Sequence, residues 1–347
     1  MQSRRRRIAI LAEATLDFHH GKTAISLLRY VPHEVVAVID STTAGTTTGE
    51  ALGVGGDVPI VCDIGQALAF QPTELLIGIA PRGGGLPASW RVQILAAIDA
   101  GLDVVSGLHY MLNDDAEFEA AALRRGVRLF DVREMPDNLE VARLAPRRNG
   151  AHVITFVGSD CAVGKMTAAL EVEAAARARG LRSSFVATGQ TGIMLVGSGV
   201  AVDRVIGDFM AGAVEHLVIQ AAEESDWVFV EGQGSLLHPG YSGVTLALLH
   251  GSAPDGMILV HPPHHDQIED YPVNVPPLDR LVKIYEEAAS WVRPAKVVGI
   301  ALNTRGLDDA ETQRAIDDAE DRTGLPATDP VKFGGSRLVE AAVTALP

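Results

Sequence analysis

The sequence predicts an α/β protein made of two doubly wound parallel-sheet domains. Three observations lead to this. Short runs rich in β-branched residues alternate with Ala- and Leu-rich helical stretches along the whole chain, as in βαβ units. The length of 347 residues exceeds the usual span of one hydrophobic core. The periodicity fades between Arg133 and Gly150, where Pro136 and Pro146 fall, and a second α/β series begins after it.

The first series opens with a strand followed by a helix, and it alternates from there. Residues 1–140 are predicted to form the first domain, and residues 141–149 a linker. The strands of the first domain are expected at 7–11, 35–39, 75–79, 104–105 and 127–130, and its helices at 22–29, 89–100 and 114–125.

The second series, residues 150–347, repeats the pattern. Its strands are expected at 153–157, 184–187, 227–230, 256–260 and 296–301, and its helices at 165–179, 208–224, 308–323 and 337–345. Asp203 and Asp208 bracket the start of one helix, and one of them is expected to be its N-cap. The tract 261–277, rich in Pro and His, is expected to form a long surface loop.

Composition excludes several classes of function. A net charge of −15 argues against nucleic acid or an anionic membrane as a partner, and the basic run Arg4–Arg7 is interpreted as a solvated lead-in to the first strand. Two cysteines, Cys62 and Cys161, indicate no disulfide framework and favour a reducing, cytoplasmic setting. No apolar run is long enough to cross a bilayer, and the start lacks the apolar core of a signal peptide.

The most informative segment runs from Phe156 to Thr167, where a strand ends in a Gly-rich turn that leads to a Lys at a helix start. Such a turn directs backbone N–H groups and the positive end of a helix toward one anion. The usual pattern places Ser or Thr directly after the Lys to hold Mg²⁺, but Met166 stands there, and a thioether is a poor ligand for a hard cation. The segment is therefore expected to bind a polyphosphate without its metal. The candidate phosphate- or CoA-binding residues are Gly158, Asp160, Cys161, Gly164, Lys165, Met166 and Thr167.

A second segment, 227–235, is a buried strand that ends in Glu231 and a Gly-rich turn. In phosphate-loop folds the neighbouring strand delivers a carboxylate to the phosphate or its metal, and here it could act as a base instead. An acid that caps the next turn is the plainer alternative. His238 follows the same strand end, where open α/β sheets bind ligands, so Glu231 and His238 are the candidate catalytic residues.

Two other groups of residues are less specific. The run 187–193 follows another strand end and fits either close approach to a ligand or a plain loop. His261, His264, His265 and Asp266 suggest metal ligands, but they lie in a Pro-rich loop without a second cluster, so we predict a surface or substrate-facing loop and no metal site. The first domain lacks the Gly-x-Gly-x-x-Gly fingerprint, and although Asp40 stands where a ribose-binding acid would lie, nicotinamide binding is not expected.

The chain resembles known proteins at two levels, one broad and one close. The loop 158–167 with Val230-Glu231-Gly232 resembles the dethiobiotin-synthetase branch of phosphate-loop proteins. The whole chain is similar to a bacterial family long catalogued as a domain of unknown function, which pairs a Rossmann-like N-terminal domain with a P-loop NTPase-like C-terminal domain and includes the DgcN-type D-glutamate N-acetyltransferases. The stretches that carry this resemblance are 160–167, 188–192, 231–235, 238–244 and 301–306.

The resemblance implies an N-acetyltransferase that moves an acetyl group from acetyl-CoA to the amine of a D-amino acid such as D-glutamate. The turn 232–235 could supply oxyanion donors, and the substrate carboxylates call for cationic partners, for which Lys22 is one further candidate. The candidate substrate contacts are Gln190, Thr191, Asp208, Gln233, Ser235, Arg82 and Arg305.

Two alternatives stay open. The first is an ATP- and Mg-dependent kinase or carboxylate ligase, and the second is a non-catalytic nucleotide-binding sensor. Two-domain α/β enzymes of this size often form symmetric homo-oligomers, and we expect one here.

Overall fold

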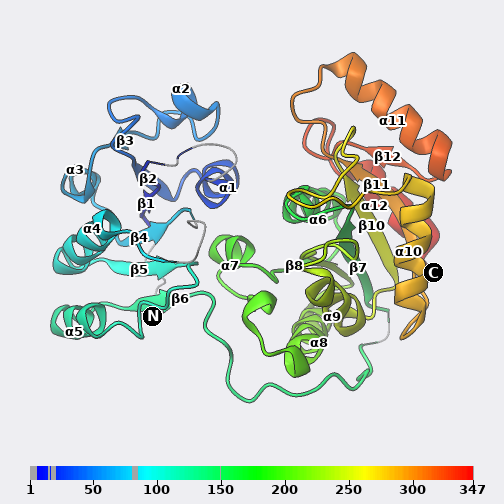
Figure 1. Ribbon diagram of the computed structural model, residues 1–347, viewed down its shortest axis with the longest axis horizontal. Helices are drawn as coiled ribbons and strands as arrows, with labels where there is room; N and C mark the ends of the chain where they lie inside the picture. The colour runs from blue at the N-terminus through cyan, green and yellow to red at the C-terminus, as the bar shows by residue number, and fades with distance from the viewer. Residues whose placement is uncertain (1–5, 15, 17–20, 80–84, 149, 347) are drawn as a thin grey trace. The chain divides into compact units, whose positions relative to one another are not determined.

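The computed structural model describes residues 6–14, 16, 21–79, 85–148 and 150–346. The chain divides into two compact units (Figure 1). The first comprises residues 1–134 and 193–198, and the second comprises residues 135–192 and 199–347. Each unit contains one six-stranded sheet with parallel pairing, which confirms the predicted fold class. Among the described residues, no helix combines the length and the apolar character that crossing a membrane requires.

The first unit has the strand order β3-β2-β1-β4-β5-β6, which is the order of a Rossmann-type sheet. Its strands are β1 (Ile8–Leu11), β2 (Val35–Ile39), β3 (Ile60–Val61), β4 (Glu74–Ile77), β5 (Asp103–Ser106) and β6 (Leu129–Asp131). Its helices are α1 (Lys22–Tyr30), α2 (Thr48–Leu52), α3 (Ile64–Ala67), α4 (Ala88–Asp99) and α5 (Ala116–Arg125). The sequence prediction missed β3, α2 and α3, because elements of two to five residues are too short to show a period.

Asp40, directly after β2, is fully buried and engaged within its own loop. Its carboxylate accepts hydrogen bonds from the Ala14 N–H at 2.9 Å and from the hydroxyls of Thr42 and Thr43 at 2.9 and 2.6 Å. These contacts give the carboxylate a structural role at the position where dinucleotide-binding folds place a ribose contact.

The second unit has the strand order β12-β11-β10-β7-β9-β8. Its strands are β7 (His152–Gly158), β8 (Ser183–Val186), β9 (Trp227–Val230), β10 (Gly256–His261), β11 (Lys296–Leu302) and β12 (Ala327–Thr328). Its helices are α6 (Lys165–Ala178), α7 (Gln190–Val196, which crosses into the residues grouped with the first unit), α8 (Gly207–Glu224), α9 (Ser242–Ser252), α10 (Leu278–Ser290), α11 (Asp309–Thr323) and α12 (Ser336–Ala345). Since β7 lies between β9 and β10, the loop after β7 stands where open α/β sheets bind ligands.

Helices cover both faces of the second sheet (Figure 1). On one face, α6 and α12 pack through residues such as Val172 and Leu338 onto Phe156 and Phe229. On the other face, α8, α9, α10 and α11 pack onto residues such as Val153 and Leu259. Both faces of the strands are therefore apolar, which is why β7 and β9 are nearly continuous hydrophobic runs.

One prediction about this unit is wrong. Neither Asp203 nor Asp208 is an N-cap, because α8 begins at Gly207 with Ile206 before it and no side-chain cap. Asp208 instead lies exposed in the first helical turn, where a carboxylate interacts favourably with the helix dipole. The run 187–193 was left open between close approach to a ligand and a plain loop, and the structure shows that α7 begins within it, at Gln190. The tract after β10 does form an irregular segment up to α10.

Candidate active site

The loop between β7 and α6 joins the end of a strand to a helix that begins with a buried lysine. Gly164 adopts φ +109°, a conformation that favours glycine, and it directs the chain into α6, which begins at Lys165. Lys165 is 6% exposed, and its Nζ donates to the Asp160 carbonyl oxygen at 2.7 Å. The ammonium group is therefore held inside the loop. Met166 and Thr167 follow in the first helical turn and are half-buried.

Three side chains from distant parts of the chain fix this loop. Asn303 Nδ2, after β11, donates to the Val163 carbonyl oxygen at 3.0 Å. The hydroxyl of Tyr285, fully buried on α10, donates to the Gly158 carbonyl oxygen at 2.7 Å. The hydroxyl of Ser235, also fully buried, donates to the Ser159 carbonyl oxygen at 3.1 Å. Sequence reasoning singled out neither Asn303 nor Tyr285, although Asn303 lies in one of the stretches that carry the family resemblance.

Asp160 anchors the Pro- and His-rich tract to the loop. This fully buried carboxylate accepts from Nε2 of His265 and from the Glu269 N–H, both at 2.8 Å, and from the Cys161 N–H at 2.6 Å. His265 was one of four candidate ligands in the tract, and the structure places it against the phosphate loop. His261, at the end of β10, has a pKa lowered to about 4 by burial, so its ring is neutral at physiological pH.

Glu231 follows β9 and is 4% exposed. Burial raises its pKa to about 7, against the lowering effect of the Thr188 and Gly189 N–H groups that donate to Oε2 at 2.9 and 3.1 Å, and of the charge on Lys165. A Cβ atom on Gly192 would lie 2.4 Å from the same Oε2, so the glycine lets α7 approach the carboxylate. A carboxyl group that titrates near neutral pH can exchange a proton under physiological conditions.

The raised pKa of Glu231 predicts a pH-dependent effect on stability. Between pH 4.5 and about 7 the folded protein retains a proton that the unfolded chain releases, so this group destabilises the fold progressively as pH rises through that window, by about 3 kcal/mol in full. Glu231→Gln removes the ionisation. We expect its free energy of unfolding, relative to wild type, to rise by about 2 kcal/mol from pH 5 to pH 8 in urea titrations. An equal difference at both pH values would contradict the raised pKa.

His238, after β9, is 5% exposed and held by aromatic rings. Its ring lies 4.6 Å from that of Tyr241 and 4.9 Å from that of Tyr271, between centroids. Nδ1 accepts from the Gly240 N–H at 3.1 Å, so the neutral ring carries its proton on Nε2. In this state His238 is a hydrogen-bond donor, which suits the stabilisation of negative charge better than removal of a proton.

The stem of Lys165 packs against two glycines. A Cβ atom on Gly232 would lie 1.8 Å from the Phe156 carbonyl oxygen and 2.8 Å from Lys165 Cδ. We expect Gly232→Ala to lower the free energy of unfolding by about 2–3 kcal/mol, because both neighbours must move. Gly243→Ala is the matched control: no atom lies within 4 Å of its added Cβ, and in α9 it should stabilise by about 0.5–1 kcal/mol. Thermal and urea unfolding would contradict the prediction if both variants behaved alike.

The other predicted substrate contacts are dispersed. Gln190 and Thr191 open α7, and Gln233 Nε2 donates to the Thr188 hydroxyl at 3.3 Å. Arg305 is exposed after β11, and its N–H donates to Asn303 Oδ1 at 3.4 Å. Lys22 is the exposed first residue of α1, in the first unit. Arg82 lies outside the described residues.

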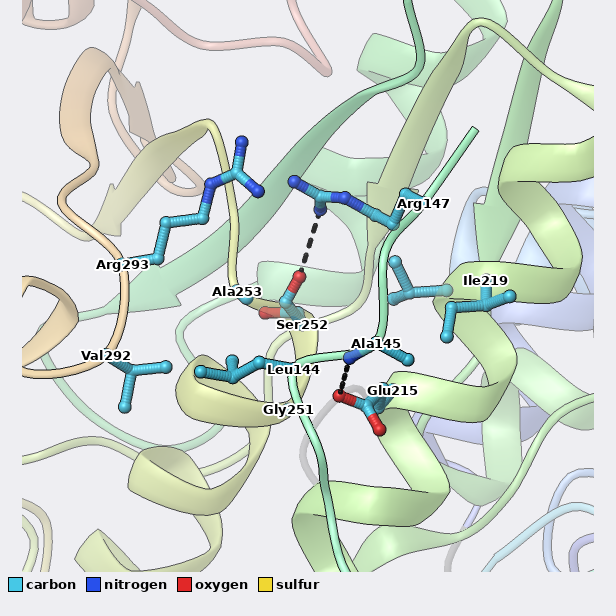
Figure 2. A pocket seen from close by; sticks show the side chains of 11 residues that line it. Leu144, Ala145, Arg147, Glu215, Ile219, Gly251, Ser252, Ala253, Val292 and Arg293 are labelled. Atoms are coloured by element: carbon cyan, nitrogen blue, oxygen red, sulfur yellow. Dashed lines mark hydrogen bonds between the residues drawn. The ribbon is translucent and has the colours of Figure 1, made fainter. Parts of the chain in front are cut away.

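A separate pocket lies at the opposite end of the second sheet, before β7 and β10 begin. Its volume is about 250 Å³, and Figure 2 shows Arg147 donating to the Ser252 carbonyl oxygen and the Ala145 N–H donating to Glu215. Arg147 also pairs with Asp255 at 3.1 Å. These bonds attach the segment before β7 to α8 and to the end of α9. The pocket thus belongs to the attachment of the segment before β7 and not to the loop between β7 and α6.

Two models of known protein families match this chain. Residues 140–339 match the family described as a domain of unknown function, DUF1611_C, P-loop domain, and residues 41–135 match its companion, the DUF1611_N Rossmann-like domain. The chain belongs to the DUF1611 family. A crystal structure of a family member from Anabaena variabilis is similar, with a TM-score of 0.93 and 43% identity over 98% of this chain and 99% of that one.

Two curated relatives of this family carry an enzyme name. D-glutamate N-acetyltransferase from Tritonibacter scottomollicae is 39% identical over 329 residues, which cover 94% of this chain and 95% of the relative. A protein of the same name from Pseudoalteromonas sp. is 35% identical over 280 residues, or 80% of this chain and 83% of the relative.

Proposed function

We propose that this protein is an N-acetyltransferase that moves an acetyl group from acetyl-CoA to the amine of D-glutamate or a similar D-amino acid. The observation that carries the proposal is the 39% identity, along 94% of the chain, to an enzyme named D-glutamate N-acetyltransferase. The resemblance covers both units, including the phosphate loop and the segment that bears Glu231.

The loop 158–167 is proposed to bind the donor. Its backbone N–H groups at the start of α6 and the ammonium group of Lys165 favour an anion. CoA offers a pyrophosphate, and its thioester oxygen becomes an anion in the addition intermediate. Acetyl transfer breaks the bond between the acyl carbon and sulfur and leaves the pyrophosphate intact, so it requires no Mg²⁺ ion for phosphoryl transfer, which agrees with Met166 in place of the usual hydroxyl ligand.

Acyl transfer requires a neutral amine, so a base must remove a proton from the acceptor or from the intermediate. Of the two predicted candidates, Glu231 suits this role better, because its pKa is about 7 and His238 already carries a proton on Nε2. His238 and the N–H groups of the turn after Glu231 are then available to stabilise the oxyanion.

The acceptor carries two carboxylates and therefore needs cationic or N–H partners. Gln190, Thr191, Gln233, Asp208, Ser235, Arg82 and Arg305 remain the proposed contacts. We also propose a reducing, cytoplasmic setting, which the low cysteine content favours, and a symmetric homo-oligomer, which is common among two-domain α/β enzymes of this size.

The test measures thiol release from acetyl-CoA with D-glutamate, with L-glutamate or without acceptor, with EDTA present throughout, and identifies the product by mass spectrometry. We expect release that depends on D-glutamate and yields N-acetyl-D-glutamate. Release of ADP from ATP and Mg²⁺, without thiol release from acetyl-CoA, would instead assign a kinase or ligase. Binding of nucleotide without turnover would assign a sensor.

A further inference from the structure

Three side chains of different chemistry meet in the phosphate loop. The Asp160 carboxylate, the Cys161 thiol and the His238 ring each place one atom within 4.8 Å of the other two. Asp160 is fully buried and His238 nearly so, whereas Cys161 is only half-buried. The thiol of a half-buried cysteine thus lies near two buried polar groups that follow different strands, β7 and β9.

Groups of both signs surround Cys161: the Asp160 carboxylate lies within 4.8 Å of the thiol and opposes its thiolate form, whereas two positive features favour it. The thiol lies in the loop that leads into α6, a helix of 14 residues whose positive end faces the loop. The Lys165 ammonium group is held 2.7 Å from the carbonyl oxygen of Asp160, directly before Cys161. Cationic groups and helix N-termini stabilise a thiolate, which is the nucleophilic form of cysteine.

The two partners of the thiol are rigidly placed. Asp160 is held by the N–H groups of Cys161 and Glu269 and by the His265 ring. His238 is held by the Gly240 N–H, and with its proton on Nε2 it can donate a hydrogen bond but not accept a proton there. The cluster therefore combines a nucleophile with a donor for negative charge, which is a set of groups that acyl transfer through a cysteine requires.

We propose that Cys161 is the nucleophile of the acetyl transfer, so that the reaction passes through an S-acetyl-Cys161 intermediate. This inference rests on the proposed function and names a catalytic residue for it. The Cys161 thiolate attacks the acetyl carbonyl carbon, the bond to the CoA sulfur breaks, and CoA leaves as a thiolate. The neutral amine then attacks the acetyl-cysteine, loses its proton to Glu231 and forms the amide, while the Cys161 thiolate leaves.

The inference also assigns the part of the donor that lies on the loop. For attack by this thiol, we place the carbonyl oxygen over the N–H groups at the start of α6 in place of the turn after Glu231, so that Lys165 neutralises the charge that develops on it. The loop then serves as an oxyanion hole, and the pyrophosphate of CoA lies outside it. The departure of Met166 from the phosphate-loop pattern is consistent with this use, because an oxyanion needs N–H donors and no Mg²⁺.

The experiment incubates the wild-type protein with acetyl-CoA alone and follows CoA release and the mass of the Cys161 peptide. We expect a burst of one equivalent of CoA, one acetyl group on Cys161, and parallel double-reciprocal plots when both substrates are varied. Cys161→Ala should show no burst and no acetyl group, and its kcat should fall on the order of 10³-fold or more. Cys62→Ala, which removes the exposed cysteine outside this unit, is the matched control and should behave as wild type.

Three results would overturn the inference. In the first, the wild-type protein shows no burst and no acetyl-cysteine and gives intersecting double-reciprocal plots. In the second, Cys161→Ala keeps the wild-type kcat. In the third, the wild-type protein contains stoichiometric zinc that Cys161→Ala loses. In the first two cases N-acetyl-D-glutamate would still form, so the proposed function would stand and transfer would be direct. The burst and the peptide mass are read on wild type, so the test holds even if Cys161→Ala fails to fold. Absence of N-acetyl-D-glutamate from wild-type reactions would instead reject the proposed function.

Discussion

Glu231→Gln is expected to lower kcat for the acetylation of D-glutamate by about 10²- to 10⁴-fold, the usual contribution of a general base. The amide is close in size to the carboxyl group and can still accept from the Thr188 and Gly189 N–H groups through its oxygen. The change therefore removes the ionisable group with little effect on packing. Initial rates at saturating acetyl-CoA and D-glutamate measure it.

The pH profile separates a catalytic role of Glu231 from a structural one. Because a base must be deprotonated and the pKa of Glu231 is about 7, wild-type activity should rise with pH through about 7, and Glu231→Gln should lose that limb. Glu173→Gln is the matched control: Glu173 is equally buried but lies on α6 and pairs with Arg177. It should keep the wild-type kcat and profile. A fully active Glu231→Gln variant would place the base elsewhere.

Lys165→Met is expected to lower kcat/KM for acetyl-CoA by about 10²- to 10³-fold. The substitution removes the ammonium group that is held within the loop and that we propose to face the donor. Methionine is similar in length and apolar, and the lysine stem already packs against Gly158 and Gly232. Folding should therefore be preserved, and thermal unfolding checks this. Lys283→Met, which replaces an exposed lysine of α10, is the control.

The kinetic constant that changes in Lys165→Met identifies the bound group. If Lys165 stabilises the oxyanion of the thioester, kcat falls and KM changes little. If it holds the pyrophosphate, KM for acetyl-CoA rises and kcat is kept. The acetyl-cysteine mechanism requires the first result. Unchanged values of both constants would remove Lys165 from the donor site.

Helices and strands could be predicted where the hydrophobic periodicity extends over enough residues. β2 and β9 occupy the predicted residues, and α6 begins at the predicted Lys165. α9 was missed because it begins within a Pro-, Gly- and Tyr-containing segment and includes Gly251, where a Cβ atom would lie 2.2 Å from the Ala211 carbonyl oxygen. That glycine permits α8 and α9 to pack closely, which is a tertiary requirement and not a local preference.

The candidate site was predictable to the extent that it is local. The turn from Gly158 to Lys165 and the acid at the end of β9 are contiguous motifs, and the structure brings the Glu231 carboxylate and the charge of Lys165 close enough to interact. The supports of the loop were not predictable. His265 and Tyr285 lie 105 and 127 residues along the chain from the loop residues that they contact, and no spacing rule relates them.

The sequence by itself determined the two parallel-sheet units, the Gly-rich loop with a lysine at the following helix start, and the absence of a hydroxyl side chain after that lysine, because periodicity, turn chemistry and side-chain type are local properties. Only the tertiary structure decided that Cys161 lies with His238 and Asp160, that Glu231 titrates near neutral pH, and that His238 is a donor. Each of these depends on burial and on partners from other strand ends, and both arise when the chain packs.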